Sequence, residues 1–129
     1  MPRTPPTSLK RAAQQLHGLL CQMPFNRMAW SNACAPGLHV RIGNAPALTE
    51  MDESLDALAG FYSRITGWNH NFIDICVRRQ TVFVETDIVV AGDRVRPLLV
   101  PCVVVARMRH ERVHDLRIYV DPAPLRRLA

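Results

Sequence analysis

A change in the hydrophobic period near Asn69 constrains the fold more than any other feature of this sequence. Before Asn69 apolar residues recur at helical spacing, and after it they alternate with polar residues. The alternation predicts strands at about 70–78, 81–91, 98–109 and 112–120, with turns at Gly92-Asp93 and at Arg109 to Glu111. Helices followed by a meander of long strands indicate an α+β domain, in which N-terminal helices pack on a curved, mostly antiparallel sheet.

The part of the chain before Asn69 is predicted to be largely helical. We expect a helix from Thr7 or Ser8 to about Met23, a short helix or turn at 25–31, a strand at 38–42, and a second long helix from a Thr49 cap to about Ile65. Glu50, Asp52 and Glu53 would lie in the first turn of that second helix, where the helix dipole favours acids.

Length and composition are those of one small globular domain. The 129 residues contain 48% hydrophobic and 21% charged residues, which excludes wholesale disorder. We expect a flexible Pro-rich tail at 1–7, one domain at 8–125 and a short tail at 126–129. No apolar run approaches the roughly 20 residues that span a bilayer, and no signal peptide is recognisable. The sequence therefore predicts a cytoplasmic protein without a membrane partner, whose four scattered cysteines are reduced and largely buried.

The net charge of +5 raises the question of nucleic-acid binding. Fifteen of the sixteen basic residues are arginines, and they are spread from Arg3 to Arg127 without forming a stripe on any predicted helix. Aromatic residues, at 6%, are too scattered to form a stacking platform. We interpret the charge as a solvated, arginine-rich surface and predict no nucleic-acid partner.

Three segments resemble the nuclear transport factor 2-like superfamily, and specifically its SnoaL-like branch. They are Asn44-Ala45-Pro46 before the second long helix, Val82-Phe83-Val84-Glu85, and the run from Leu116 to Pro122. The resemblance covers about residues 8–125 and implies a cystatin-like, cone-shaped half-barrel with a ligand pocket at its open end. It also implies a homodimer formed through the outer face of the sheet. Members include polyketide cyclases, ketosteroid isomerases, epoxide hydrolases and non-catalytic binding modules.

The positions that carry acids in the catalytic members can be compared individually with this chain. Where epoxide hydrolases have an arginine and an aspartate on the second meander strand, this chain has Thr86 and Ile88. Ile118 stands where hydrolases and cyclases have an aspartate on the last strand. Ile42 replaces a tyrosine, and only Asn44 is retained. The resemblance therefore implies that the acid–base residues of both enzyme types are absent.

Strand alternation independently predicts the same apolar interior. Val82, Val84, Thr86, Ile88 and Val90 share one face of their strand, and Leu116, Ile118 and Val120 share one face of theirs. The charged residues would then line the outer face, where Glu85 or Asp87 could pair with Arg117. We expect a pocket lined by Trp30, Ile42, Asn44, Tyr62, His70, Thr86, Ile88 and Ile118, without cofactor or metal.

Two functional hypotheses of different classes follow. The first is a module that holds a small hydrophobic molecule without transforming it. The second is an enzyme of the cyclase, isomerase or dehydratase kind that uses His70, His17 or Asn44. A pocket where two polar groups converge would favour the enzyme, and an all-aliphatic pocket would favour the module. A weaker third hypothesis is a structural dimer without ligand.

Residues His110 to His114 match the zinc-protease pattern His-Glu-x-x-His. That chemistry requires a helix, which brings both histidines onto one face. The flanking Val103-Val104-Val105 and Leu116 to Tyr119 favour strands, on which residues four apart lie about 13 Å apart. We therefore interpret the match as a coincidence.

Overall fold

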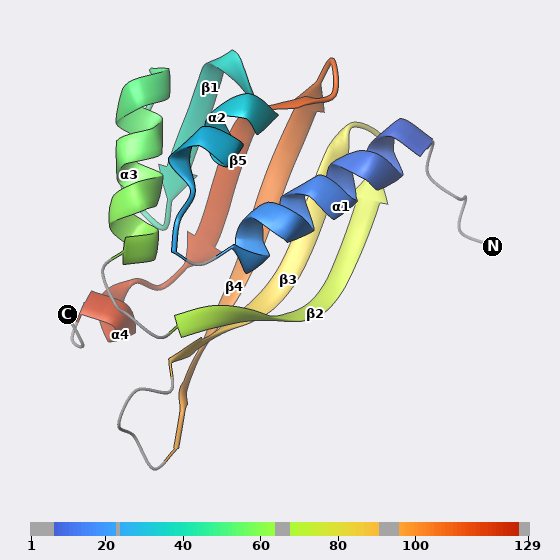
Figure 1. Ribbon diagram of the computed structural model, residues 1–129. Coiled ribbons are helices and arrows are strands. Elements are labelled where there is room, and N and C mark those ends of the chain that lie inside the picture. The colour runs from blue at the N-terminus through green and yellow to red at the C-terminus, as the bar shows by residue number, and fades with distance from the viewer. Residues whose placement is uncertain (1–6, 23, 64–67, 91–95, 127–129) are drawn as a thin grey trace.

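The computed structural model describes residues 7–22, 24–63, 68–90 and 96–126, with nine helices and strands in these ranges. They are α1 (Thr7–Cys21), α2 (Arg27–Ala33), β1 (Cys34–Ile42), α3 (Met51–Ser63), β2 (Trp68–Arg78), β3 (Thr81–Val90), β4 (Leu98–Arg109), β5 (Arg112–Val120) and α4 (Ala123–Arg126) (Figure 1). The tail before Thr7, the turn at Gly92-Asp93, the helix ends predicted at Met23 and Ile65, and residues 127–129 lie outside the described residues.

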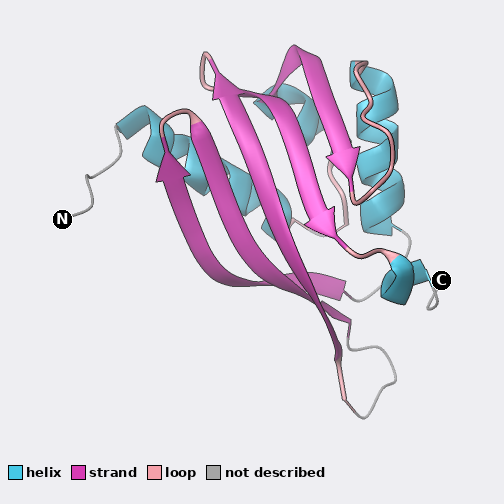
Figure 2. Ribbon diagram, turned by 180° about the vertical axis from the view of Figure 1, so that it is seen from behind, coloured by secondary structure: helices cyan, strands magenta, loops and turns pink. Residues whose placement is uncertain are grey.

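The predicted meander is confirmed, and β1 extends it. The strand order is β1-β5-β4-β3-β2, with β1 parallel to β5 and every other pair antiparallel. In Figure 1 helices α1, α2 and α3 lie over one face of a strongly curved sheet. Figure 2 shows the opposite face, with these helices behind the sheet. The α+β architecture predicted from the sequence is therefore correct.

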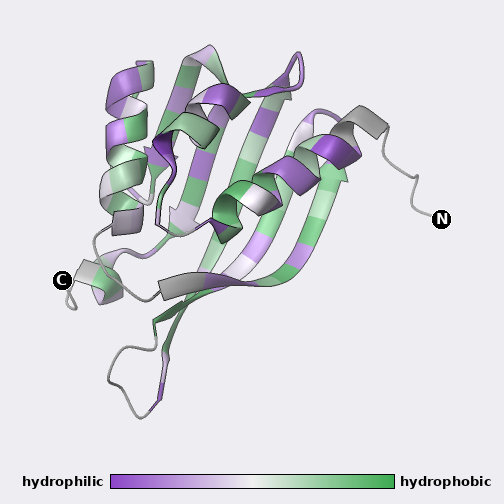
Figure 3. Cartoon of the chain, in the orientation of Figure 1, coloured by the Kyte–Doolittle hydropathy of each residue, from purple (hydrophilic) through white to green (hydrophobic). Residues whose placement is uncertain are grey.

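The predicted alternation of strand faces is also correct. Val82, Val84, Thr86, Ile88 and Val90 are all buried, as are Leu116 and Ile118. Glu85 and Tyr119, which neighbour these residues, are exposed on the outer face. Figure 3 shows the resulting alternation of hydrophilic and hydrophobic bands along the strands. Because the side-chain period of a strand is two, one face of the sheet is committed to the core.

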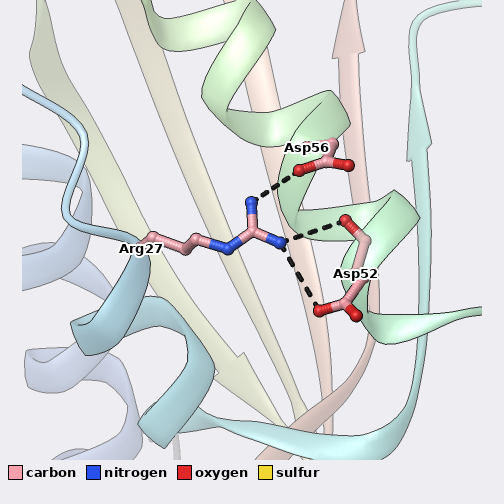
Figure 4. Close-up of polar contacts among 3 residues, drawn as sticks. All are labelled: Arg27, Asp52 and Asp56. Atoms are coloured by element: carbon pink, nitrogen blue, oxygen red, sulfur yellow. Dashed lines mark hydrogen bonds and ion pairs between the residues drawn. The ribbon is translucent and has the colours of Figure 1, made fainter.

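The helices supply the other half of the core. Their buried side chains are Ala12, Leu16, Leu19 and Leu20 of α1, Trp30 and Ala33 of α2, and Leu55, Leu58 and Tyr62 of α3. Arg27 of α2 forms ion pairs with α3, at 2.7 Å to Asp56 and 3.5 Å to Asp52 (Figure 4). Both acids are largely solvent-exposed, so these pairs orient the two helices and add little stability. Among the described helices, none is long and apolar enough to cross a bilayer.

Several predicted boundaries differ from the structure, including the start of β2, which is Trp68 instead of about residue 70. Strand β1 begins at Cys34 instead of Leu38, because Cys34 pairs with Val113 of β5 before an irregularity in the register. Helix α2 begins at Arg27, after Asn26, whose side chain accepts a hydrogen bond from the Ala29 amide. Helix α3 begins at Met51, and the carbonyl of Glu50, not of Thr49, accepts its first bond, from Ser54.

The predicted pairing of Glu85 or Asp87 with Arg117 is wrong. Strand β4 lies between β3 and β5, so these residues are not on adjacent strands. Arg117 instead forms an ion pair within its own strand, in which its Nε lies 3.3 Å from Oδ1 of Asp115. Strand alternation assigns a residue to a face, but it carries no information about which strands are neighbours.

The prediction of largely buried thiols holds for half of the cysteines. Cys34 and Cys102 are buried, whereas Cys21 and Cys76 are exposed. Cys76 is exposed because it lies on the edge strand β2, opposite the outward-facing Phe83. All four are free thiols, as predicted.

Candidate functional site

An apolar groove of about 380 Å³ lies beside the edge strand β1. Its walls come from β1, from the segment 42–48, from α3 and from the chain after β5. The lining residues are Val40, Ile42, Asn44, Ala45, Pro46, Leu48, Ala57, Gly60, Phe61 and Pro122. This volume lies within the range of about 300–1,000 Å³ that is usual for small-molecule sites.

The segment after β1 is folded back to form one wall of the groove. Gly43 adopts a left-handed conformation (φ 58°) and donates its amide to the Ile118 carbonyl at 2.8 Å. A side chain at this position would contact the Val120 carbonyl at 3.1 Å, so the tight turn requires glycine. Leu48 then returns to pair with Val40 through two backbone hydrogen bonds, of 2.9 and 2.8 Å.

The chemistry of the groove is that of a hydrophobic site with one polar side chain. Arg41 donates to the Ala45 carbonyl at 3.1 Å and holds the loop from outside. Among the lining residues only Asn44 has a polar side chain, and it is exposed. An amide can donate to and accept from one bound oxygen, so it can orient a ligand without acting as an acid or base. Ile42 and Asn44, two of the predicted site residues, are thus brought together here.

Three other predicted site residues form a second, buried group. His70 of β2 lies with Nε2 3.2 Å from the Tyr62 hydroxyl and Nδ1 2.8 Å from the Thr86 hydroxyl. Tyr62 comes from α3 and Thr86 from the inner face of β3, so this group connects helix and sheet. A neutral imidazole has one donor and one acceptor nitrogen, and each hydroxyl can supply the complementary role. His70 is therefore a buried, hydrogen-bonded histidine rather than a solvent-exposed one.

Burial keeps this group uncharged at neutral pH. Desolvation lowers the pKa of His70 from 6.5 to about 4 and raises the pKa of Tyr62 well above 10. Cys102, opposite Thr86 on β4, has its pKa raised to about 12 by burial, although a hydrogen bond with Thr86 opposes the shift. The imidazole of His70 is thus unprotonated at neutral pH. Its pKa is lowered, whereas a neighbouring carboxylate would raise it.

The remaining predicted site residues are core side chains. Trp30, Ile88 and Ile118 are at most 1% exposed. Trp30 forms a cluster with Phe25 and Tyr62, in which its ring centroid lies 6.0 and 6.3 Å from theirs. Two further hollows accompany the groove, and Trp30, Tyr62, His70, Thr86, Ile88 and Ile118 line none of the three. The structure thus divides the predicted set between the groove, the buried polar group and the core.

The zinc-protease pattern does not form a helix. His110 and Glu111 form a turn, as predicted, and Arg112 begins β5. In the described parts of the chain, no three histidine, cysteine, aspartate or glutamate residues are clustered closely enough to hold a metal ion. His17, the other candidate base, packs against Phe72 at a centroid distance of 4.1 Å.

Sequence reasoning missed most of the groove. Phe61 and Gly60 of α3, Leu48 and Pro122 come from three separate segments. Gly60 offers one local signal, since an exposed glycine inside a helix lowers helix stability and invites a functional reason. The other residues appear as ordinary core or loop residues until the fold brings them together.

The pKa of His70 predicts a specific dependence of stability on pH. Between pH 6.5 and about 4 the unfolded chain binds a proton at this position that the folded chain does not. The contribution of neutral His70 to the free energy of unfolding is therefore complete above pH 6.5 and is lost as the pH falls toward 4. At 1.36 kcal/mol per unit it amounts to about 3 kcal/mol. Urea unfolding at several pH values should show this loss in the wild type and a smaller loss in His70→Gln. Equal losses would contradict the assignment.

Scans against family models and curated proteins found no match to this chain. Solved structures, in contrast, match nearly its whole length. A candidate SnoaL-like polyketide cyclase from Jannaschia sp. CCS1 has a TM-score of 0.79 and 18% identity, over 99% of this chain and 96% of that one. A nuclear transport factor 2-like protein of unknown function from Burkholderia pseudomallei has a TM-score of 0.69 and 14% identity, over 94% and 93%.

Two further matches show how widely this architecture is used. An LEH-like epoxide hydrolase of M. tuberculosis has a TM-score of 0.68 and 15% identity, over 94% of this chain and 88% of that one. A de novo designed protein with a curved β-sheet has a TM-score of 0.73 and 12% identity, over 92% of each chain. At these identities the likeness concerns the fold alone. The chain has the nuclear transport factor 2-like fold, which it shares with SnoaL-like proteins.

Proposed function

We propose that the protein binds a small apolar molecule in the groove between β1, α3 and the segment 42–48, and does not transform it. One observation carries the proposal: the groove has apolar walls and a single polar side chain, Asn44. A site of this composition gains affinity from burial of the ligand's surface and orientation from one amide. It lacks the two convergent polar groups that acid–base catalysis requires.

The inner face of the sheet supports the same conclusion. Thr86, Ile88 and Ile118 occupy positions where, by resemblance, the catalytic members of the superfamily have charged side chains, and all three are at most 1% exposed. A carboxylate at these positions would have to be desolvated without a partner. Ile88 and Ile118 instead fill the core with apolar side chains, and the Thr86 hydroxyl is hydrogen-bonded to His70.

The buried polar group favours the enzyme as a second candidate. Tyr62, His70 and Thr86 are joined by hydrogen bonds, and the lowered pKa of His70 keeps its imidazole neutral at neutral pH, although it also makes the imidazole a weaker proton acceptor. An isomerase or dehydratase acting on a hydrophobic substrate would need such a base. The two candidates differ in one measurable way: the module returns its ligand unchanged, and mass spectrometry of the molecule released from the protein distinguishes them.

Filling the groove tests the proposed binding site. A Cβ added at Gly60 meets no atom within 4 Å, so Gly60→Leu should extend into the groove without disturbing α3. Gly18→Leu is the matched control, since Gly18 also has open space around its Cβ and lies outside the groove. Binding of the neutral dye Nile red, followed by fluorescence, should weaken at least about tenfold in Gly60→Leu and be retained in Gly18→Leu.

The urea midpoint of unfolding of both variants should equal or exceed that of the wild type, because leucine is a better helix former than glycine by roughly 1 kcal/mol. Equal dye binding by the two variants would place the ligand outside the groove. Failure of the wild-type protein to bind the dye would contradict an apolar site altogether.

We also propose that the outer face of the sheet forms a homodimer. Phe83 and Val103 are only half-buried there, and Leu99 and Tyr119 are 55% and 52% exposed. Figure 2 shows this face on the side of the sheet opposite the helices. Exposed apolar side chains on a sheet face that helices do not cover, here interspersed with the charged Glu85 and Arg117, are typical of association between copies.

Sedimentation velocity at micromolar concentration should therefore show a dimer. Val103→Glu places a charge at the middle of the face and should convert the protein to monomers. Met28→Glu, at a 74% exposed position of α2, is the control and should remain dimeric. A monomeric wild type, or a dimer that survives Val103→Glu, would contradict an interface on the outer face.

A further inference from the structure

A second hollow, of about 470 Å³, lies between α1, α2 and the β4–β5 turn. It is lined by Arg11, Ala12, Gln15, Asn32, His110, Glu111 and Arg112. None of these residues lines the apolar groove, which lies beside β1, α3 and Pro122. Six of the seven side chains are polar or charged, so this hollow is chemically the opposite of the groove.

Positive charge dominates the hollow. Two arginines, Arg11 and Arg112, line it together with one carboxylate, that of Glu111. Arg109 is the direct cross-strand partner of Arg112, and like charges in that position repel one another. Within the described residues, the ion pairs of the structure involve Arg27 and Arg117, and neither Arg11, Arg109 nor Arg112 takes part in one. Among the residues that the structure describes, three arginines from α1 and the β4–β5 hairpin are thus not engaged in ion pairs, and Glu111 is the one carboxylate that lines the hollow.

The turn that contributes His110 and Glu111 places two non-glycine residues in the left-handed region. Both residues have positive φ, 51° and 65°, in a two-residue hairpin loop where Asn-Gly is the common pair. Histidine is tolerated in the left-handed region, whereas a glutamate there is uncommon. Strained positions that persist in a fold often mark functional sites. Here the strain fixes a histidine and a glutamate at the rim of an arginine-lined hollow.

We propose that this hollow binds a small organic anion that carries at least two negative charges on carboxylate or phosphate groups. Arginine forks match either group through paired hydrogen bonds, which sets the ligand class. His110, Gln15 and Asn32 supply further donors around the rim. Glu111 opposes binding and thereby limits affinity. The volume of the hollow suits a small molecule, whereas a nucleic acid would require an extended basic track.

The experiment is isothermal titration calorimetry at low ionic strength. Inorganic pyrophosphate and citrate are titrated separately into the full-length protein. We expect one saturable site for at least one of these anions, weakened by added salt. Binding of pyrophosphate alone would assign phosphate ligands, and binding of citrate alone would assign carboxylates. Arg11→Gln and Arg112→Gln should each lower the affinity about tenfold. Glu111→Gln should raise it severalfold, an effect that a structural role would not produce.

Arg96→Gln is the matched control. Arg96 is exposed and precedes β4, at the end of that strand opposite the turn, so its removal changes the net charge equally and leaves the hollow intact. Equal weakening by Arg96→Gln and Arg112→Gln would reduce the effect to net charge and overturn the proposal. Absence of binding by both anions at millimolar concentration would overturn it too. So would tight binding of a single-stranded oligonucleotide without binding of either anion.

Discussion

Burial of one face of the curved sheet under α1, α2 and α3 is the constraint on which the rest of this structure depends. The inner residues of β3 and β5 are nearly all inaccessible to solvent, and their neighbours along the strands face outward. Because the side-chain period is two, no residue can change face without shifting the whole strand. Charged side chains are thereby assigned to the outer face, and positions such as Ile88 and Ile118 are assigned to the core. In β3 and β5, the absence of carboxylates from the inner face is thus part of how the chain folds.

This constraint also explains where chemistry remains possible. In the interior, His70 has hydrogen-bond partners in Tyr62 and Thr86, whereas the buried Ser54 hydroxyl has none among the described residues. Ligand-sized space instead appears at the margins, beside β1 and beside the β4–β5 turn. Both places are shaped by residues with positive φ, Gly43 in one and the pair His110 and Glu111 in the other. Proteins that share a fold can thus differ in function through the segments that border the core.

Local signals in the sequence predicted most of the fold and less of the site. The strand faces, the meander and the hairpin turn at Arg109 to Glu111 follow from alternation and turn chemistry, which act within a few residues. The start of β1 differs because the alternation in the sequence begins at Leu38, whereas pairing with β5 extends the strand back to Cys34. The groove depends on α3 approaching the segment 42–48, a long-range packing that neither segment encodes alone. The burial of His70 likewise depends on Tyr62 and Thr86, from two other elements.

The measurement that tests this account most directly is the free energy of unfolding of Ile118→Asp compared with Ile73→Asp. Ile118 is 1% exposed on the inner face of β5, and Ile73 is 55% exposed at the irregularity of the edge strand β2. A carboxylate buried without a partner should lower the free energy of unfolding by about 3–5 kcal/mol at Ile118. The same substitution at Ile73 should cost about 0.5 kcal/mol or less. Similar small losses at both positions would show that Ile118 faces solvent. The assigned faces of β5 would then be reversed, and the argument against catalytic residues on the inner face would fail.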